Sequence, residues 1–163
     1  MKIKYWFLWI IVSLVSTIFS CEAPEPSREQ LTEQTALAYF AVYQQREDWD
    51  SLLTFYREDL QFKDANLGYE TRGIEAFKDF YNWPDTSFRK VIPEQKHLVL
   101  QELLVRDSVA VGRGRLSPFF WNNELQEWPE DFTIWLYFDQ DMKIYRQTDW
   151  VRYPAWMLQS FER

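Results

Sequence analysis

The spacing of apolar residues changes once along this chain, near Pro84, and that change limits the folds it can form. Before Pro84 apolar residues recur mainly at helical intervals, and after it they alternate as in strands. Helices are expected over residues 27–47, 50–59 and 71–83, with a strand over 60–64 before the third helix. Helices followed by a strand meander are typical of an α+β domain, with three N-terminal helices packed on one face of a strongly curved antiparallel sheet.

Local signals set the expected ends and buried sides of these helices. Ser27 followed by Gln30 matches the capping-box pattern at a helix start. Asp50 is the expected cap of the second helix, and Pro84 disfavours helical geometry at Trp83. The apolar positions expected to share a side are Leu31, Leu37, Ala38, Ala41 and Val42 in the first helix, and Leu52, Leu53 and Tyr56 in the second.

Alternating apolar residues and turn signals predict four strands after Pro84. These strands cover residues 97–106, 109–121, 131–139 and 143–153. His97, at the start of the first of them, is expected at the surface with no functional role. A short tail helix is expected over residues 155–161.

The N-terminus carries the features of an export signal. Lys2 and Lys4 precede an uninterrupted apolar stretch over residues 5–19, and Ser20 and Cys21 follow it. About 15 apolar residues are too few to span a bilayer comfortably. We therefore expect this segment to direct export rather than to join the fold.

The four residues that end at Cys21, Ile-Phe-Ser-Cys, resemble a bacterial lipoprotein box, in which the cysteine receives a diacylglycerol and becomes the new N-terminus. The resemblance implies a lipoprotein signal peptide over residues 1–20, lipidation of Cys21 and anchorage to the cell envelope. Residues 21–30 would be a tether and residues 31–163 the domain. An ordinary cleaved signal and an uncleaved N-terminal anchor are the alternatives, and all three export the domain.

The composition of the exported part argues against several kinds of partner. Removing residues 1–20, which hold two lysines and no acid, changes the formal charge from -7 to -9. An acidic chain without a run of Lys or Arg is not typical of nucleic-acid binding. The chain has one histidine, and its single cysteine would carry the lipid, so the residues needed for a conventional zinc site are missing. No cofactor is expected.

Two aspartates are candidate acid or base residues. Strand alternation places Asp64 on the same face as Phe62, and it places Asp149 with Gln147 on the face opposite Arg146. Burial on an apolar face would raise the pKa of either carboxyl group and suit it to proton transfer. The structural alternatives are that Asp64 caps the turn after it and that Asp149 only hydrogen-bonds Gln147 or a tyrosine.

Aromatic residues and glycines suggest either a rich core or a ligand pocket. Seven of the nine tryptophans follow Cys21. Gly112 and Gly114 share one face of their strand and leave volume there, which an aromatic residue of the first helix fills or which forms the floor of a cavity. The expected ligand contacts are Phe40, Tyr43, Gly112, Gly114 and Gln147.

Taken together, these elements resemble the superfamily of nuclear transport factor 2, ketosteroid isomerase and the SnoaL-type polyketide cyclases. The resemblance covers roughly residues 31–153. It rests on the order and spacing of the motifs EDWDSL at 47–52, FKD at 62–64, GIEAF at 73–77 and KI at 143–144 leading to Asp149. It implies a cone of three helices against a bent sheet. It also implies that Asp64 matches the isomerase's proton-shuttling base, and Asp149 the acid that SnoaL-like cyclases carry on their final strand.

Two positions depart from the isomerase. Its oxyanion hole needs a tyrosine on the first helix and a protonated aspartate on the penultimate strand. By the resemblance these positions are Phe40 and Ile134, and neither side chain can donate a hydrogen bond to an enolate. Steroid isomerisation by that mechanism is therefore not expected.

The sequence leads to one functional hypothesis and one alternative. The hypothesis is a membrane-tethered domain that binds a small, largely apolar molecule in the cone, with acid/base chemistry by Asp64 and Asp149. The alternative is a non-catalytic interaction module of the cell envelope, whose exposed sheet face pairs with a second copy or another partner. The residues expected on that face are Val109, Val111, Trp135 and Tyr137.

Overall fold

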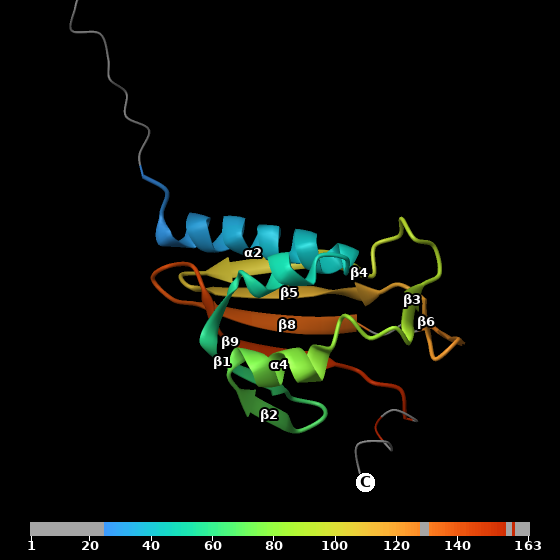
Figure 1. The fold of residues 1–163 in the computed structure, drawn as a ribbon. Helices are drawn as coiled ribbons and strands as arrows, with labels where there is room; N and C mark the ends of the chain where they lie inside the picture. Colours follow the sequence, from blue (N-terminus) through green and yellow to red (C-terminus); the bar gives the residue numbers. More distant parts are fainter. Residues whose placement is uncertain (1–24, 128–130, 156–157, 159–163) are drawn as a thin grey trace, which may run out of the picture.

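Three helices lie against a six-stranded sheet in the part of the chain that the structure describes (Figure 1). This computed structural model describes residues 25–127, 131–155 and 158, so the expected signal peptide and Cys21 lie outside the described residues. The helices are α2 (Arg28–Gln45), α3 (Trp49–Leu53) and α4 (Ile74–Tyr81). The strands of the large sheet are β1 (Tyr56–Asp64), β2 (Tyr69–Arg72), β4 (Leu98–Arg106), β5 (Val109–Leu116), β8 (Asp131–Phe138) and β9 (Ile144–Val151).

The large sheet is mainly antiparallel and has the strand order β2-β1-β9-β8-β5-β4. Helix α2 packs on β4 and β5, and α4 packs on β1 and β2, so the predicted α+β class with helices on a curved sheet is confirmed (Figure 1). One pair is parallel, because β1 runs beside β9 in the same direction. This pairing sets Asp64 directly beside Asp149.

A second, three-stranded sheet was not expected from the sequence. It consists of β3 (Phe88–Lys90), β6 (Phe119–Trp121) and β7 (Glu124–Gln126), paired in the order β3-β6-β7. The predicted strand over 109–121 is divided between β5 and β6 at Pro118, which has no N–H group to donate to a strand partner. The small sheet lies at one end of the large sheet (Figure 1).

Helix α2 begins as predicted but buries a different side. Ser27 Oγ accepts a hydrogen bond from Gln30 N (3.2 Å), and Gln30 Oε1 accepts one from Ser27 N (2.7 Å), so the capping box is confirmed. The helix thus begins within the segment expected as a tether. The predicted apolar side is wrong, since Leu37 is 48% exposed. The buried residues are Thr32, Ala36, Tyr39, Phe40 and Tyr43, because large rings at helical spacing bury more apolar area than alanines do.

The predicted second helix over residues 50–59 is too long. Helix α3 ends at Leu53, and its N-cap is Asp48, whose Oδ1 accepts from Ser51 N (2.8 Å), rather than Asp50. Tyr56 is already in β1, where Leu60 and alternate residues after it are buried. Every second residue from Leu60 to Asp64 is buried, which is the pattern of a strand. This alternation determines the local structure from Tyr56 on, although Leu52, Leu53 and Tyr56 have helical spacing.

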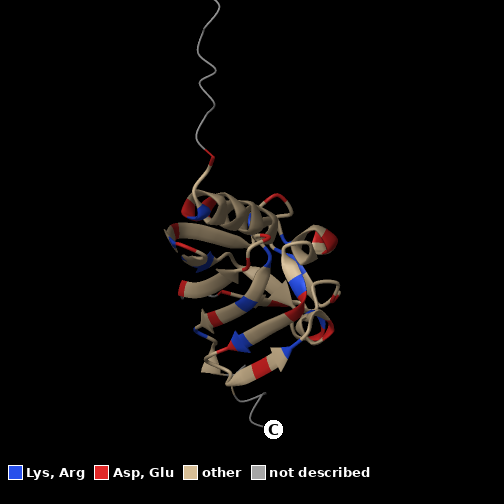
Figure 2. Ribbon diagram, turned by 90° about the vertical axis from the view of Figure 1, so that its left-hand side faces the viewer, with Lys and Arg blue, Asp and Glu red and all other residues tan. Residues whose placement is uncertain are grey.

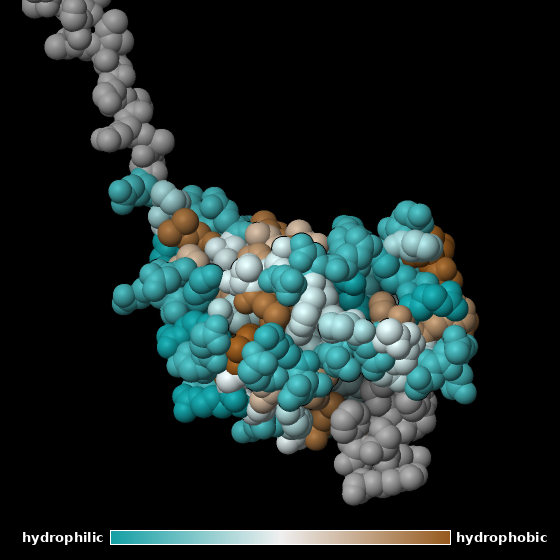
Figure 3. Space-filling model, viewed as in Figure 1, coloured by the Kyte–Doolittle hydropathy of each residue, from teal (hydrophilic) through white to brown (hydrophobic). Residues whose placement is uncertain are grey.

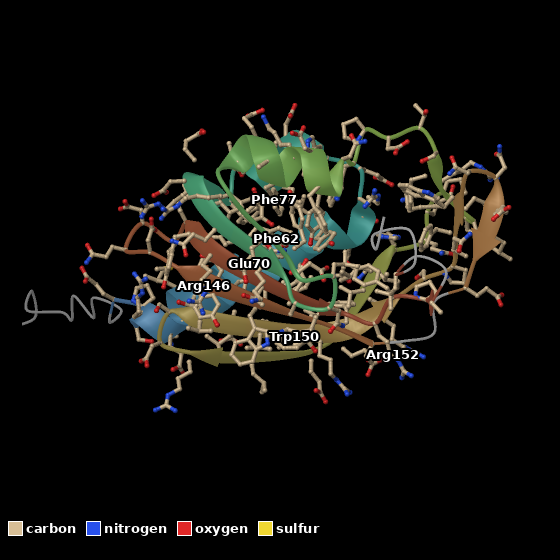
Figure 4. All side chains as sticks on the ribbon, turned by 90° about the horizontal axis from the view of Figure 1, so that it is seen from below. Phe62, Glu70, Phe77, Arg146, Trp150 and Arg152 are labelled. Carbon is tan, nitrogen blue, oxygen red and sulfur yellow. The ribbon has the colours of Figure 1, made fainter. Side chains whose placement is uncertain are left out.

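The third helix is shorter than predicted at both ends. Residues 69–72 form β2 instead of a loop and a first helical turn. Gly73 has a φ of +93°, a conformation that glycine adopts readily, and α4 starts after it. The helix stops at Asn82, in the left-handed region, before Pro84 is reached. Phe77 of α4 and Phe62 of β1 pack edge to face with ring centroids 5.3 Å apart, between the helix and the sheet (Figure 4).

The surface is mixed in charge and mostly hydrophilic. Basic and acidic residues are interspersed over the helices and strands (Figure 2), and hydrophilic residues cover most of the face seen in Figure 3. Among the described residues, no helix combines the length and the apolar character needed to cross a membrane. Of the expected tail helix over 155–161, only Ala155 and Leu158 are described, and both are helical.

Candidate functional site

A cavity of about 550 Å³ lies between the sheet, the ends of α2 and α4, and the small sheet. Its volume is typical of small-molecule sites. Aromatic and aliphatic side chains form most of its wall, among them Phe80, Phe88, Leu116, Phe119 and Phe132. A few polar groups interrupt this wall, including Arg46, His97, Asp149 and Tyr153. Of the residues predicted to contact a ligand or to act as acid or base, Tyr43 and Asp149 line the cavity.

Asp149 is the buried acid of this cavity. It lies on β9 and is 2% exposed, so the predicted inward orientation is confirmed. Its Oδ2 accepts a hydrogen bond from the Tyr81 hydroxyl, and its Oδ1 accepts one from Gln147 Nε2 (2.9 Å). Burial raises the pKa of Asp149 to about 7; the nearby Asp64 adds to this increase, whereas the two hydrogen bonds oppose it. Asp149 therefore exchanges between acid and carboxylate forms near neutral pH.

Gln147 positions Asp149 rather than lining the cavity. It is fully buried, and its Oε1 accepts from the hydroxyls of Tyr56 (2.7 Å) and Tyr39 (3.3 Å). Its Nε2 donates to the Tyr81 hydroxyl (3.0 Å) as well as to Asp149. The amide is thus held by hydrogen bonds at both ends, which fixes the orientation of the Asp149 carboxyl group.

Asp64 is buried beside Asp149 but is not among the described residues that line the cavity. Its Oδ1 accepts from Asn66 N (3.1 Å) and Leu67 N (2.9 Å), so it does cap the turn after β1. Its Oδ2 accepts from the Tyr153 hydroxyl, and Tyr153 itself lines the cavity. Burial raises the pKa of Asp64, and these hydrogen bonds oppose the increase. Asp64 therefore reaches the cavity indirectly, through its hydrogen bonds with Tyr153 and Leu67, which both line it.

Phe40, Gly112 and Gly114 lie in the packed interior and not among the described residues of the cavity wall. A Cβ atom at Gly112 would lie 2.2 Å from Phe40 Cζ. A Cβ atom at Gly114 would lie 2.0 Å from the Val99 carbonyl oxygen and 2.9 Å from Phe132 Cζ. The space above Gly112 is therefore filled by the Phe40 ring, which is the first of the two alternatives for these glycines.

His97 and Arg46 are among the cavity residues that were missed in the sequence. His97 is 6% exposed, so its expected surface position is wrong, and its ring packs edge-on against Phe88 and Phe119 (centroids 4.8 and 5.4 Å). Burial lowers the pKa of His97 to about 3, with further contributions from the charges of Arg46 and Lys90, so the imidazole is neutral. Both His97 and Leu98 are buried, which breaks the alternation that would have indicated an inward His97. Arg46 follows the last residue of α2, where no sequence pattern marks it.

Comparisons with known proteins identify the fold. No protein-family model matches the sequence, and a search of curated proteins found no match. Solved structures do match. A polyketide cyclase candidate from Xanthomonas campestris pv. campestris has a TM-score of 0.59 at 21% identity, over 82% of this chain and 98% of its own. The chain has the nuclear transport factor 2-like fold.

Two further structures illustrate the range of this nuclear transport factor 2-like fold. A protein of this type from Anabaena variabilis has a TM-score of 0.60 at 15% identity, over 77% of this chain and 92% of its own. TerC, co-crystallised with polyporic acid, has a TM-score of 0.58 at 18% identity, over 82% of this chain and 99% of its own. Identities this low show the fold alone.

Within this nuclear transport factor 2-like fold, the two positions compared above with the isomerase oxyanion hole are buried and apolar. Phe40 is 0% exposed and Ile134 is 1% exposed. Two carboxyl groups lie on the described cavity wall, the buried Asp149, to which Tyr81 is bonded, and the exposed Asp79. Tyr153, also on this wall, is bonded to Asp64. Among the described residues, no three His, Cys, Asp or Glu side chains cluster as a metal site requires.

Proposed function

We propose that the cavity binds a small, largely apolar molecule and that Asp149 exchanges a proton with it. The observation that carries this proposal is an ionisable, buried carboxyl group on the wall of a mostly aromatic cavity. With a pKa of about 7, Asp149 can accept a proton as carboxylate or donate one as acid at neutral pH. In an isomerisation it would take a proton from one carbon and return it to another, which leaves the proton count unchanged.

The neighbouring residues have supporting roles in this proposal. Tyr81 and Gln147 orient the Asp149 carboxyl group through their hydrogen bonds. Asp64 acts as a positioning residue, because it holds the hydroxyl of Tyr153 and does not line the cavity itself. The similar fold of TerC, which was crystallised with polyporic acid, supports a small molecule as the ligand.

A cavity-filling variant tests the binding site. Leu116→Trp replaces an aliphatic side chain of the cavity wall by a much larger indole ring, which would fill part of the cavity. Native mass spectrometry of protein purified from its own host should show a retained small molecule in the wild type. We expect about tenfold less of this molecule in the variant. Leu125→Trp is the matched control, because Leu125 is 50% exposed and is not among the lining residues. Equal retention in both variants would contradict binding in this cavity.

An exposed apolar row on the sheet favours an interaction module as the alternative function. Leu104, Val111 and Trp135 are register partners across β4, β5 and β8, and Leu104 and Trp135 are 70% and 38% exposed. Trp150, on the neighbouring β9, is 50% exposed (Figure 4). Such a row can pair with a second copy or an envelope partner. The same mass spectra distinguish the alternative, which requires a stable assembly of higher mass with no retained molecule.

We further propose that the domain is held at the bacterial cell envelope by a lipid on Cys21, which follows the apolar N-terminal stretch. We expect the intact mass of the detergent-extracted protein to correspond to a chain that begins at Cys21 and carries added acyl chains. Cys21→Ser should yield the full-length mass without lipid, because the modified sulfur is lost. A wild-type chain cleaved near this point without added mass would indicate an ordinary signal, and an uncleaved wild-type chain would indicate an anchor.

A further inference from the structure

Arg46 places a cation against the aromatic wall of the cavity. It follows the end of α2 with a φ of +51°, and its side chain lines the cavity. Its guanidinium lies 4.1 Å from the ring centroid of Phe88 and 5.4 Å from that of Trp83. These contacts hold the planar group in place without neutralising it.

The charge of Arg46 has no bonded acid within the described part of the chain. Arg46 takes part in none of the ion pairs found there, and its Nε is buried without a hydrogen-bond partner. The negative charge of Asp85 favours the positive charge of Arg46 from a distance. The Oδ1 atom of Asp85, however, already accepts hydrogen bonds from Ser87 N (2.8 Å) and Ser87 Oγ (2.7 Å). A buried polar group left without a partner costs free energy, so a ligand anion at this place would be stabilised.

His97 provides a second unpartnered group at the same cavity. Its Nδ1 is buried without a hydrogen-bond partner, and the residue as a whole is only 6% exposed. A neutral imidazole carries a proton on one of its two nitrogens, so Nδ1 can donate to an anionic oxygen.

The other charged groups of the cavity wall do not compete with Arg46. Besides Asp149, the acid of the wall is Asp79, which is solvent-exposed on α4. Arg46 is the only Lys or Arg among the described lining residues.

We infer that the molecule bound in this cavity is an aromatic or otherwise apolar carboxylate, whose carboxylate group binds Arg46 with His97 Nδ1 as an additional donor. The inference rests on the proposed function and names its ligand class. A carboxylate matches the fork of guanidinium N–H donors, and the apolar body packs against Phe88, Leu116 and Phe119. The anionic end and the proton-transfer group Asp149 then contact different parts of one molecule.

A matched pair of probes tests this inference on the wild-type protein. 2-Naphthoic acid and 2-naphthamide share the same rings and differ in charge. Their binding is measured by calorimetry at pH 8 on protein that was unfolded and refolded to remove any retained molecule. A hydrogen bond to a charged group favours the carboxylate by about tenfold or more. We expect this preference in the wild type and its loss in Arg46→Gln, while Arg46→Lys, which keeps the charge, retains part of it.

Arg89→Gln is the control for Arg46→Gln. Arg89→Gln should leave the preference unchanged, because the exposed Arg89 stacks on Phe120 (4.1 Å) and is not among the lining residues. Equal binding of both probes would overturn the inference and leave the proposed function standing. A preference that survives in Arg46→Gln would also overturn it. If neither probe binds, the proposed apolar site loses its support and the inference fails with it. The probe comparison in the wild type does not depend on the folding of any variant.

Discussion

The Asp149→Asn variant should lack a pH-dependent loss of stability of about 4 kcal/mol that the wild-type protein shows. Burial raises the pKa of Asp149 from the usual 3.8 to about 7 in the folded protein, whereas the unfolded chain keeps the usual value. Each tenfold change in the proton equilibrium corresponds to about 1.4 kcal/mol, which gives a total of about 4 kcal/mol. Asparagine has a similar shape and no proton to lose, so the variant lacks this dependence.

The direction of the effect follows from which state holds the proton. Between pH 4 and pH 7 the folded protein keeps the Asp149 proton and the unfolded chain has lost it, so the free energy of unfolding falls as the pH rises. Below pH 4 both states are protonated, and above about pH 7 both are ionised, so the contribution is constant there. The cost of keeping this carboxyl group buried is therefore largest at alkaline pH.

Urea unfolding at pH 4 and pH 8 measures this difference. The free energy of unfolding of the wild type, minus that of Asp149→Asn, should fall by about 4 kcal/mol between the two values of pH. Asp59→Asn is the control of opposite sign, because the hydrogen bond from Arg57 lowers the pKa of the exposed Asp59. Removal of that carboxylate should cost more at pH 8 than at pH 4. No change with pH in the Asp149 difference would contradict a raised pKa and, with it, the proposed proton transfer.

The sequence predicts the strand faces well because alternation is a local property. Phe62, Asp64 and Asp149 are buried as predicted, and the capping box at Ser27 is formed as predicted. The prediction also left open whether Asp149 would be bonded to Gln147 or a tyrosine, and the structure shows bonds to both. Here local patterns are sufficient, since each depends on neighbours within a few residues.

The remaining features of the site depend on contacts between distant segments. Tyr153 reaches Asp64 across 89 positions of the chain and Tyr81 reaches Asp149 across 68, and no pattern in the sequence sets such pairs. The small sheet that covers His97 is built from strands of three residues, too short for alternation to indicate. Among the described polar residues of the cavity wall, Tyr43 and Asp149 were predicted from the sequence, and the others became visible only in the structure.

A methyl group added at Gly112 should destabilise the protein by about 3 kcal/mol, and a smaller side chain at position 40 should relieve much of that cost. In Gly112→Ala the new Cβ would lie 2.2 Å from Phe40 Cζ, well inside contact distance, so the ring or the strand must shift. Phe40→Leu removes that atom but leaves a gap of its own. The free energy of unfolding of Gly112→Ala/Phe40→Leu should therefore exceed, by about 1 kcal/mol or more, the value expected from adding the two single effects.

Gly114 provides the matched control for this double-mutant cycle. Gly114→Ala would bring its Cβ to 2.0 Å from the Val99 carbonyl oxygen, which belongs to the backbone of the neighbouring strand. Phe132→Leu would relieve only the contact with the ring, so it should not recover the stability lost in Gly114→Ala. Urea unfolding of the six variants measures both cycles.

The outcome at Gly112 also tests, in solution, that the Phe40 ring fills the volume above this strand. If the Phe40 ring fills it, the two substitutions are coupled, and the Gly112→Ala/Phe40→Leu protein still binds 2-naphthoic acid, because neither residue is among those that line the cavity. Additive effects together with lost probe binding would instead make this volume the floor of the ligand site. The cycle therefore separates a core that is rich in rings from a pocket that extends beneath α2.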